Sequence, residues 1–419
     1  MRYQGKNVLV LGIGKSGSAV CDFLQEEGAV VDGYDDYRLS EPPDVLLCKR
    51  YDFCVISPGV SLEHPMVHLI AANGAPIISE LDLAYLNCPS DRIFAISGTN
   101  GKTTACKILA AMLSEVGKCH LVGNIGVPFI SKVKEIGRKD LIVVEMSSFQ
   151  IEESQDFLPF YAALTNLGED HLDRHHTPER YREVKLSLLH RAKHAVVNGD
   201  DPYEREIRKG IRYSREDESA DYYLREREIV CRGETYRLPP VSRGEGYDWD
   251  YLCAFAVAHD AFGYRKGFLK CYETVVLPRY RNEYIGMLNG AKVFNDSKGT
   301  NIDATLFALS ERRERTAVIL GGSDKGEDYR RLMCGVGKGA KRIYLVGGNA
   351  TEMYLAASEE VRRICLLMPD LESCVRDFAA RPLEALLFSP ASASFDRYKN
   401  YEERGQAFDE IYLKYISYE

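Results

Sequence analysis

The chain has 419 residues, of which 45% are apolar and 28% are charged. This composition is that of a globular protein and excludes a chain that is mainly disordered. The 62 acidic residues outnumber the 54 basic ones, which gives a net charge of −8. An acidic chain is a poor general binder of nucleic acid or of an anionic membrane, so we expect neither as a partner.

The twelve cysteines lie scattered in apolar runs and form no C-x-x-C pair. This pattern indicates small buried side chains in a reducing compartment rather than disulfides or a zinc site. The sequence contains no signal-peptide pattern and no apolar run long enough to span a membrane. We therefore expect a cytoplasmic protein.

Short β-rich apolar runs alternate with helical patterns, which is typical of α/β folds with parallel sheets. In residues 1–90 we expect strands at 7–11, 29–34 and 53–56 and a helix at 19–27. In residues 91–278 we expect strands at 92–97, 140–145 and 195–198, helices at 103–116 and 250–263, and a polar hairpin within 214–248. In residues 279–419 we expect strands at 316–320, 342–346 and 385–388 and a helix at 403–416. The predicted fold has three domains: a Rossmann-like N-terminal domain, a central P-loop ATPase-like domain with a parallel sheet, and a Rossmann-like C-terminal domain.

The first motif is Gly12-x-Gly14-x-x-Gly17, which follows a strand and opens a helix. Glycines in this context allow a tight turn and let backbone amides approach a diphosphate at the helix N-terminus. Asp35 follows at the end of the next strand. The motif fits a dinucleotide dehydrogenase, a nucleotide-sugar site, or a plain strand-to-helix turn.

The second motif is Gly98-Thr99-Asn100-Gly101-Lys102-Thr103-Thr104, again between a strand and a helix. Ile96 occupies the place where the general P-loop pattern has its first glycine, and Gly98 follows two residues later. The chemistry is retained, because amides can surround phosphate, the lysine can reach the β and γ oxygens, and Thr103 can bind Mg²⁺. The motif predicts an ATP site.

Carboxylates and a histidine follow two later strands. Glu145 ends an apolar strand, where a Mg²⁺ ligand belongs beside a P-loop strand. The loop 166–174 gathers acidic residues around His171, so it could bind a divalent cation or be a charged surface loop. Lys185 follows on a helix that begins near Pro178.

The last block has three loops rich in Gly, Ser or Lys near strand ends, where α/β sheets place ligands. They are Asn295–Asn301, Gly321–Gly326 and Ser389–Asp396, and the last is followed by Tyr401 and Arg404-Gly405. None of these loops alone decides between a binding site and a plain connection.

Taken together, these residues resemble the Mur ligase family along the whole chain. The Gly-Thr-Asn-Gly-Lys-Thr-Thr string is typical of Mur ligases and of folylpolyglutamate synthases. The short first block and the Ser-Pro-Ala-x-Ala-Ser-x-Asp string resemble the branch that adds D-glutamate. In that branch the first-block glycines bind UDP, which argues against the dehydrogenase interpretation.

The resemblance implies a role for each matching residue. It implies ATP binding by Gly98, Thr99, Asn100, Gly101, Lys102, Thr103, Thr104, Arg281 and Asp296. It implies binding of the UDP substrate by Gly14, Lys15, Ser16, Asp35, Arg38, Gly59, Asn124 and Ser147, and binding of D-glutamate by Lys325, Ser394, Phe395 and Tyr401. It implies two Mg²⁺ ions on Thr103, Glu145, His171 and Lys185, the lysine being carbamylated, and catalytic roles for Lys102, His171, Lys185 and Lys298.

The chain departs from the family pattern at a few positions. Tyr247 and Asp250 stand where the family has an Asn-x-x-Asn pair on the adenine side. Tyr401 replaces a phenylalanine, Gly299 replaces an alanine, and Arg38 is displaced by one residue from its usual place.

The implied reaction is an ATP-driven amide ligation, in which D-glutamate is joined to UDP-N-acetylmuramoyl-L-alanine through an acyl phosphate. ATP is a co-substrate, the enzyme is expected to be a monomer, and closure of the third domain is expected to complete the site. Two alternatives remain open at this point. One is a related ligase that adds L-alanine, a diamino acid or folate glutamate, and the other is an inactive nucleotide-sugar binding protein.

Overall fold

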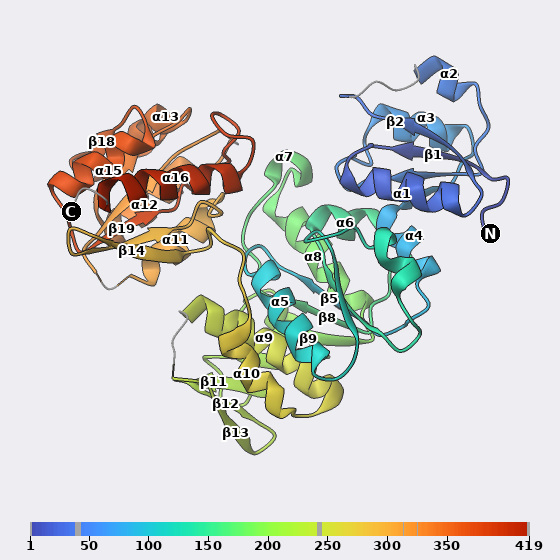
Figure 1. Ribbon diagram of the computed structural model, residues 1–419, viewed down its shortest axis with the longest axis horizontal. Coiled ribbons are helices and arrows are strands. Elements are labelled where there is room, and N and C mark those ends of the chain that lie inside the picture. Colours follow the sequence, from blue (N-terminus) through green and yellow to red (C-terminus); the bar gives the residue numbers. More distant parts are fainter. Residues whose placement is uncertain (1, 38–42, 241–244, 313, 325, 417–419) are drawn as a thin grey trace. The chain divides into compact units, whose positions relative to one another are not determined.

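The computed structural model describes residues 2–37, 43–240, 245–312, 314–324 and 326–416 (Figure 1). The chain divides into two compact units, Met1–Val276 and Leu277–Glu419. Within the described residues, the first unit contains two sheets and the second contains one.

The first sheet is parallel and has the order β2(Val30–Tyr34), β1(Asn7–Leu11), β3(Phe53–Ile56), β4(Ile77–Ser79). Its helices are α1(Lys15–Glu26), α2(Pro43–Leu47), α3(Pro65–Ala72) and α4(Glu80–Asn87). Gly12 makes the turn from β1 with φ +83°, a conformation that favours glycine. The Ser57 hydroxyl at the end of β3 donates to the Gly12 carbonyl at 2.6 Å. The ends of β1 and β3 are thereby held together beside the N-terminus of α1.

The central sheet has the order β13-β12-β11-β10-β9-β8-β5-β7-β6 in the described chain. Its parallel strands are β5(Ile93–Ser97), β6(Cys119–Gly123), β7(Leu141–Glu145), β8(Tyr161–Leu164), β9(His194–Asn198), β10(Ile211–Ser214) and β11(Tyr222–Arg225). An antiparallel extension is formed by β12(Glu228–Cys231) and β13(Glu234–Arg237). The helices are α5(Lys102–Ser114), α6(Ser148–Glu153), α7(Leu172–His175), α8(Pro178–Arg191), α9(Glu245–Phe262) and α10(Lys266–Thr274), with short turns η1(Ile130–Glu135) and η2(Glu204–Glu206). Strand β5 therefore lies between β7 and β8, and all three end at the same edge of the sheet.

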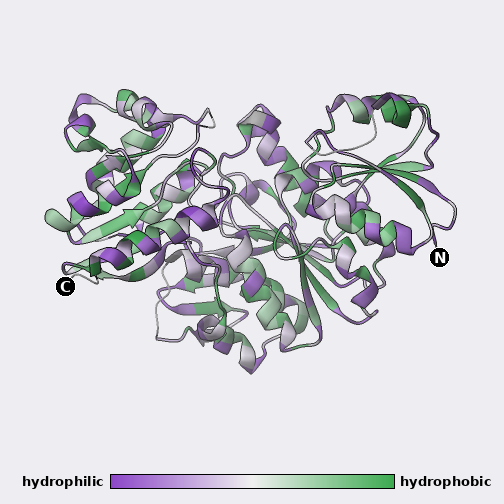
Figure 2. Cartoon of the chain, turned by 45° about the horizontal axis from the view of Figure 1, so that its top comes forward, coloured by the Kyte–Doolittle hydropathy of each residue, from purple (hydrophilic) through white to green (hydrophobic). Residues whose placement is uncertain are grey.

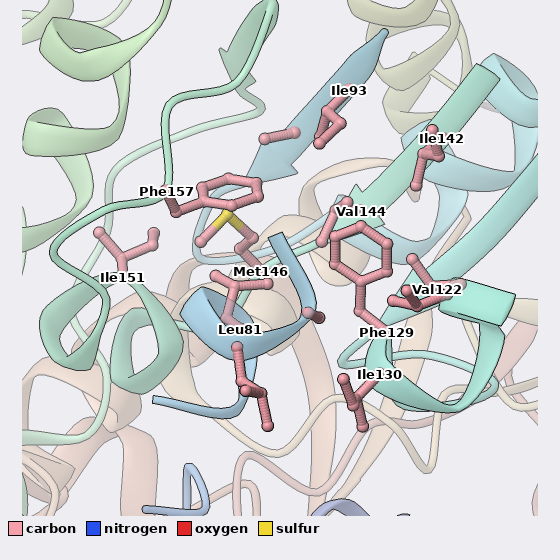
Figure 3. Packing of buried hydrophobic residues seen from close by; sticks show 14 of the residues in the cluster. Leu81, Ile93, Val122, Phe129, Ile130, Ile142, Val144, Met146, Ile151 and Phe157 are labelled. Atoms are coloured by element: carbon pink, nitrogen blue, oxygen red, sulfur yellow. The ribbon is translucent and has the colours of Figure 1, made fainter. Parts of the chain in front are cut away.

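One hydrophobic core joins the two sheets of the first unit. It contains Val8 and Val10 of β1 together with Ile142 and Val144 of β7. Figure 3 shows Leu81 of α4 packed among central-sheet residues, near Met146 and Ile130. This shared core explains why the first two predicted domains form one compact unit.

The sheet of the second unit has the order β14(Glu283–Leu288), β15(Ala291–Asn295), β19(Ala385–Phe388), β16(Thr316–Leu320), β17(Ala340–Leu345), β18(Cys365–Leu367). Strand β14 is antiparallel to β15, and the other pairs are parallel. The helices are α11(Ile302–Ser310), α12(Tyr329–Gly339), α13(Ala350–Ala356), α14(Glu359–Arg362), α15(Leu371–Ala380) and α16(Tyr401–Ile416). Two hydrophobic clusters cover the sheet, and Figure 2 shows its strands mostly in the green of apolar residues.

The predicted α/β class with three sheets is confirmed, while the boundaries near residues 90 and 278 stay a prediction. Helix α1 begins at Lys15 rather than at residue 19, because Gly14 is its N-cap, and α9 begins at Glu245 rather than at residue 250. The twelve cysteines are free, but Cys48 and Cys334 are exposed, so the prediction that the cysteines are buried was wrong for them. Among the described helices, none has both the length and the apolar character that crossing a bilayer requires.

Candidate active site

The loop between β5 and α5 needs glycine at two positions. Gly98 has φ +141° and Gly101 has φ +79°. A Cβ at Gly98 would lie 2.0 Å from Thr165 Oγ1, and one at Gly101 would lie 2.1 Å from Asp250 Oδ1. The loop is therefore fitted closely against the end of β8 and against α9.

Side chains from later segments hold this loop in place. The Asn100 amide donates to Asn166 Oδ1 at 3.0 Å. The Tyr181 hydroxyl donates to Thr99 Oγ1 at 3.1 Å, and the Gly168 amide donates to the same oxygen at 2.8 Å. The loop is thus preformed at the N-terminus of α5, where backbone amides and the helix dipole favour an anion.

Lys102 lies over the same loop. Its Nζ donates to the carbonyl oxygens of Gly98 at 2.9 Å and of Thr99 at 2.8 Å. An ammonium at this place brings positive charge to the loop and can neutralise phosphate oxygens bound there.

Thr103, Glu145 and Asn124 come together beside the loop. The Thr103 hydroxyl donates to Glu145 Oε2 at 2.8 Å, and Asn124 Nδ2 donates to Glu145 Oε1 at 2.9 Å. Both Thr103 and Glu145 are buried. Thr103 lies in the first turn of α5, and Glu145 is the last residue of β7. Ser147, two residues after Glu145, caps α6 by accepting a hydrogen bond from the Gln150 amide at 3.2 Å.

Lys185 lies on helix α8, and its buried side chain reaches the end of strand β5. Its Nζ donates to the Gly98 carbonyl at 2.8 Å and to Ser97 Oγ at 3.1 Å. Burial holds the pKa of this amine well below its usual range, and the neighbouring charge of Lys102 lowers the pKa further. Asp170 and Glu145 act in the opposite direction. A neutral amine is the form that can react with carbon dioxide.

His171 opens the short helix α7 and has φ +53°. Its Nε2 lies 3.7 Å from Asp170 Oδ2, and its ring packs on Phe149 with 4.8 Å between centroids. The loop therefore presents an imidazole and a carboxylate, which are donor types for a divalent cation.

The predicted residues of the first sheet gather around the turn at Gly12. Asp35 Oδ2 accepts a hydrogen bond from the Ile13 amide at 2.7 Å, which fixes the turn. Gly14 caps α1, Ser16 lies in its first turn, and Lys15 Nζ donates to the Gly126 carbonyl. Gly59 lies in the turn after β3, with nothing within 4 Å of an added Cβ. Arg38 lies outside the described residues.

In the second unit, the predicted residues Asp296 and Lys298 follow β15, Arg281 precedes β14, and Tyr401 opens α16. Asp296 is buried and accepts hydrogen bonds from Ser389 Oγ at 2.7 Å and from the Asn282 amide at 2.9 Å. Burial raises the pKa of Asp296 to about 6, although the charges of Arg281 and Lys298 lower it. Lys298 Nζ lies 5.1 Å from the centroid of the Tyr401 ring.

The remaining predicted residues of that unit lie on the loop after β19. Ser394 is buried and its carbonyl accepts a hydrogen bond from the Tyr398 amide at 2.9 Å, whereas the Phe395 side chain is 74% exposed. Arg404 braces this loop from α16, with Nη1 donating to the Ala393 carbonyl at 2.9 Å. Lys325 lies outside the described residues.

Residues 96–241 match the model of the Mur ligase middle domain. The chain is 34% identical to the UDP-N-acetylmuramoylalanine–D-glutamate ligase of Pelotomaculum thermopropionicum, over 97% of this chain and 97% of that protein. The chain belongs to the Mur ligase family. The enzyme of the same name from Koribacter versatilis is 33% identical, over 99% of this chain and 98% of that one.

Solved structures of other ligases share the fold of this Mur ligase. The MurF ligase of Thermotoga maritima in complex with ADP has a TM-score of 0.64 at 17% identity, over 99% of this chain and 96% of that one. A pseudomurein peptide ligase type C from Methanothermus fervidus has a TM-score of 0.65 at 15% identity, over 97% of this chain and 100% of that one.

The donor groups at the phosphate loop fit one Mg²⁺ ion that binds together with a nucleotide. Thr103 and Glu145 supply a hydroxyl and a carboxylate oxygen, and Mg²⁺ at such sites takes its other ligands from phosphates and water. Among the described residues, no group of three His, Cys, Asp or Glu side chains could hold a metal by itself. The Lys185 amine becomes an oxygen donor only as a carbamate.

Sequence reasoning missed several residues that shape the Mur ligase site. Tyr181 lies one helical turn before Lys185 on α8, and this i, i+4 spacing is a signal that could have indicated it. Asn166 holds the phosphate loop, although its segment in the sequence indicates only a cation site or a charged surface loop. Asp250 was noted as a departure from the family, but its fit against Gly101 is visible only in the fold.

Proposed function

We propose that this Mur ligase joins D-glutamate to UDP-N-acetylmuramoyl-L-alanine, converting ATP to ADP and phosphate, as a step of peptidoglycan precursor synthesis. The observation that carries the proposal is the end-to-end similarity to enzymes of that name. The geometry at the phosphate loop supports the ATP-dependent half of the reaction.

The chemistry requires activation, because a carboxylate does not react with an amine at neutral pH. The L-alanine carboxylate attacks the γ-phosphorus of ATP, ADP leaves, and an acyl phosphate forms. The amine of D-glutamate then attacks the acyl carbon, phosphate leaves with the bond pair, and the nitrogen gives up a proton to the departing phosphate. Two anions must meet in the first step, so positioning and neutralisation of charge are the main tasks of the site.

The residues of the phosphate loop serve these tasks. Gly98 and Gly101 let the backbone amides approach the phosphates, and Lys102 supplies positive charge. Thr103 and Glu145 would hold Mg²⁺, which when bound neutralises phosphate charge. Asn124 fixes the orientation of the Glu145 carboxylate through its hydrogen bond.

The burial of Lys185 supports the role that we propose for it. A buried amine with a lowered pKa is available in the neutral form for carbamylation. The carbamate and His171 would hold a second Mg²⁺. The proposed role of carbamylated Lys185 is therefore that of a metal ligand, and this role depends on the burial of the lysine.

The other substrates are assigned to the remaining predicted residues. We assign the UDP moiety to Gly14, Lys15, Ser16, Asp35 and Gly59, and the N-acetylmuramoyl part to Asn124 and Ser147. We assign ATP to Arg281 and Asp296, and D-glutamate to Ser394, Phe395 and Tyr401. Lys298 supplies positive charge near Asp296. UDP-linked precursors and ATP are cytoplasmic metabolites, so the reaction is proposed to occur in the cytoplasm, with the enzyme acting as a monomer.

The test is phosphate release with ATP, Mg²⁺ and UDP-N-acetylmuramoyl-L-alanine. We expect release with D-glutamate, and none with L-glutamate, with L-alanine or without an amino acid. Lys102→Ala is the negative control for the phosphate loop. Release with another amino acid, or no release from folded protein, would contradict the proposed substrate.

A further inference from the structure

Arg174 on α7 contacts two other segments of the first unit at once, helix α6 and the turn after β3. Its Nη2 donates to Glu153 Oε1 at 2.6 Å, and its Nε donates to Glu152 Oε2 at 3.2 Å. Its Nη1 donates to the Pro58 carbonyl at 3.1 Å, and its Cζ lies 4.2 Å from the centroid of the Phe149 ring. The side chain is only 11% exposed. A planar guanidinium can make all these contacts together, whereas a lysine ammonium cannot.

The contacted groups lead to two parts of the proposed site. The Phe149 ring that lies against Arg174 also packs on the His171 ring. Pro58 directly precedes Gly59, and Ser57 before it donates to the Gly12 carbonyl at 2.6 Å. One guanidinium therefore joins the His171 loop to the glycine turn of the first sheet.

The ion pair with Glu153 is more suited to fixing geometry than to adding stability. The Glu153 side chain has no exposed surface, and its Oε2 has no hydrogen-bond partner among the described residues. Burial raises the pKa of Glu153 to about 8, and the charge of Arg174 acts against this rise. Because desolvation offsets much of the attraction in such a pair, its contribution lies in where it holds the two groups.

We propose that Arg174 is a positioning residue that couples binding of the UDP-linked substrate at the glycine turn to metal binding at His171. The inference rests on the proposed function. Arg174 acts through Pro58 on one side and through Phe149 on the other. Such coupling is reciprocal: the metal strengthens substrate binding by the same factor by which the substrate strengthens metal binding.

The variants separate positioning from charge balance. Arg174→Gln removes both the positive charge and the planar set of guanidinium donors, whereas Arg174→Lys keeps only the positive charge. Glu153→Gln with Arg174→Gln replaces both members of the pair by neutral amides, so that no buried carboxyl group is left without its partner. Arg180→Gln is the matched control, because Arg180 also pairs with Glu152, at 3.9 Å, but from a side chain that is 55% exposed.

The measurements are two binding constants, each taken with and without the other ligand. Calorimetry gives the affinity for UDP-N-acetylmuramoyl-L-alanine, and electron paramagnetic resonance gives the affinity for Mn²⁺. In the wild type and in Arg180→Gln, we expect each ligand to strengthen the other about 10-fold. In Arg174→Gln, Arg174→Lys and the double variant, we expect less than about 2-fold.

Three results would overturn the proposal. The first is that each ligand still strengthens binding of the other fully in Arg174→Gln. The second is that this strengthening is restored in the double variant, and the third is that the wild type does not show it. If Arg174→Gln does not fold, the double variant and Arg174→Lys decide. Phosphate release with D-glutamate is measured on the same wild-type protein: an inactive wild type refutes the proposed function, whereas an active wild type with unchanged coupling in Arg174→Gln refutes only the role of Arg174.

Discussion

Alanine at Gly101 tests how closely the phosphate loop is fitted against α9. Gly101 has φ +79°, and an added Cβ would lie 2.1 Å from Oδ1 and 2.8 Å from Cγ of buried Asp250. Gly233, between β12 and β13, has φ +81° and nothing within 4 Å of an added Cβ. The two glycines therefore share a backbone conformation and differ in the space around them.

The difference can be given a magnitude. A left-handed conformation costs about 1–2 kcal/mol for alanine, and this is the whole expected loss of unfolding free energy in Gly233→Ala. At Gly101 the added carbon also collides with a short, buried side chain, and such overpacking costs about 1–3 kcal/mol more. We therefore expect Gly101→Ala to lose about 2–5 kcal/mol, and to bind ADP more weakly because the loop must shift.

The chain has a single tryptophan, Trp249, which lies next to Asp250 and donates from Nε1 to the Thr165 carbonyl at 3.1 Å. Its fluorescence during urea unfolding reports on this region directly. Adding Asp250→Ala removes the colliding carboxylate, so the double variant should recover about 1–3 kcal/mol of the loss. Equal losses in Gly101→Ala and Gly233→Ala, or no recovery in the double variant, would refute the reasoning.

Three further predictions concern the buried charges and the metal. Lys185→Ala should abolish phosphate release, and high bicarbonate should not restore it. The control is Lys193→Ala, because Lys193 is an exposed lysine. An active Lys185→Ala variant would exclude the carbamate role. Burial raises the pKa of Glu80 from 4.5 to about 7, so the folded state keeps a proton that the unfolded state loses, and stability falls as the pH rises through this window. Because Glu80→Gln leaves no titrating group at this position, the free energy of unfolding of the variant should rise relative to the wild type by up to about 3 kcal/mol between pH 4.5 and 7. Urea unfolding at several pH values measures this difference, and a difference that does not change with pH would contradict the prediction. EDTA should stop phosphate release and Mg²⁺ should restore it. Thr103→Val should require about 10-fold more Mg²⁺, because the ion loses the hydroxyl that we assign to it beside Glu145. An unchanged Mg²⁺ requirement would place the ion elsewhere.

Nine parallel strands of the described chain were predicted because each is a short, continuous apolar run, whereas the parallel strands β4, β6, β8, β10, β15 and β18 were not predicted. Strands 7–11, 53–56, 316–320 and 385–388 have the predicted bounds, and the other predicted strands differ from the observed ones by one or two residues at an end. The polar hairpin was also recognisable: Arg232 and Gly233 turn between β12 and β13 with φ +50° and +81°. Strand β14 was missed because it is half exposed and has no buried alternation that would mark it.

The phosphate loop was predicted because its motif is local in sequence. Its supports were not, because they come from distant segments. Nothing near Gly101 indicates that Asp250 lies against it, and nothing near Arg174 indicates that it reaches Pro58. Such contacts depend on which strands become neighbours, and the local pattern of residues does not encode this.

The contacts of the phosphate loop also determine when, during synthesis of the polypeptide, the loop can reach its final structure. A ribosome makes residues 98–101 early, but their partners Asn166, Tyr181 and Asp250 are added much later. Until α9 has left the ribosome, the loop lacks the surface against which Gly101 is fitted, and helix α5 lacks a neighbour. Domains fold as units during synthesis, so the nascent chain should gain affinity for nucleotide only once this helix has emerged. Nucleotide retention by stalled chains of increasing length would then date the completion of the first unit.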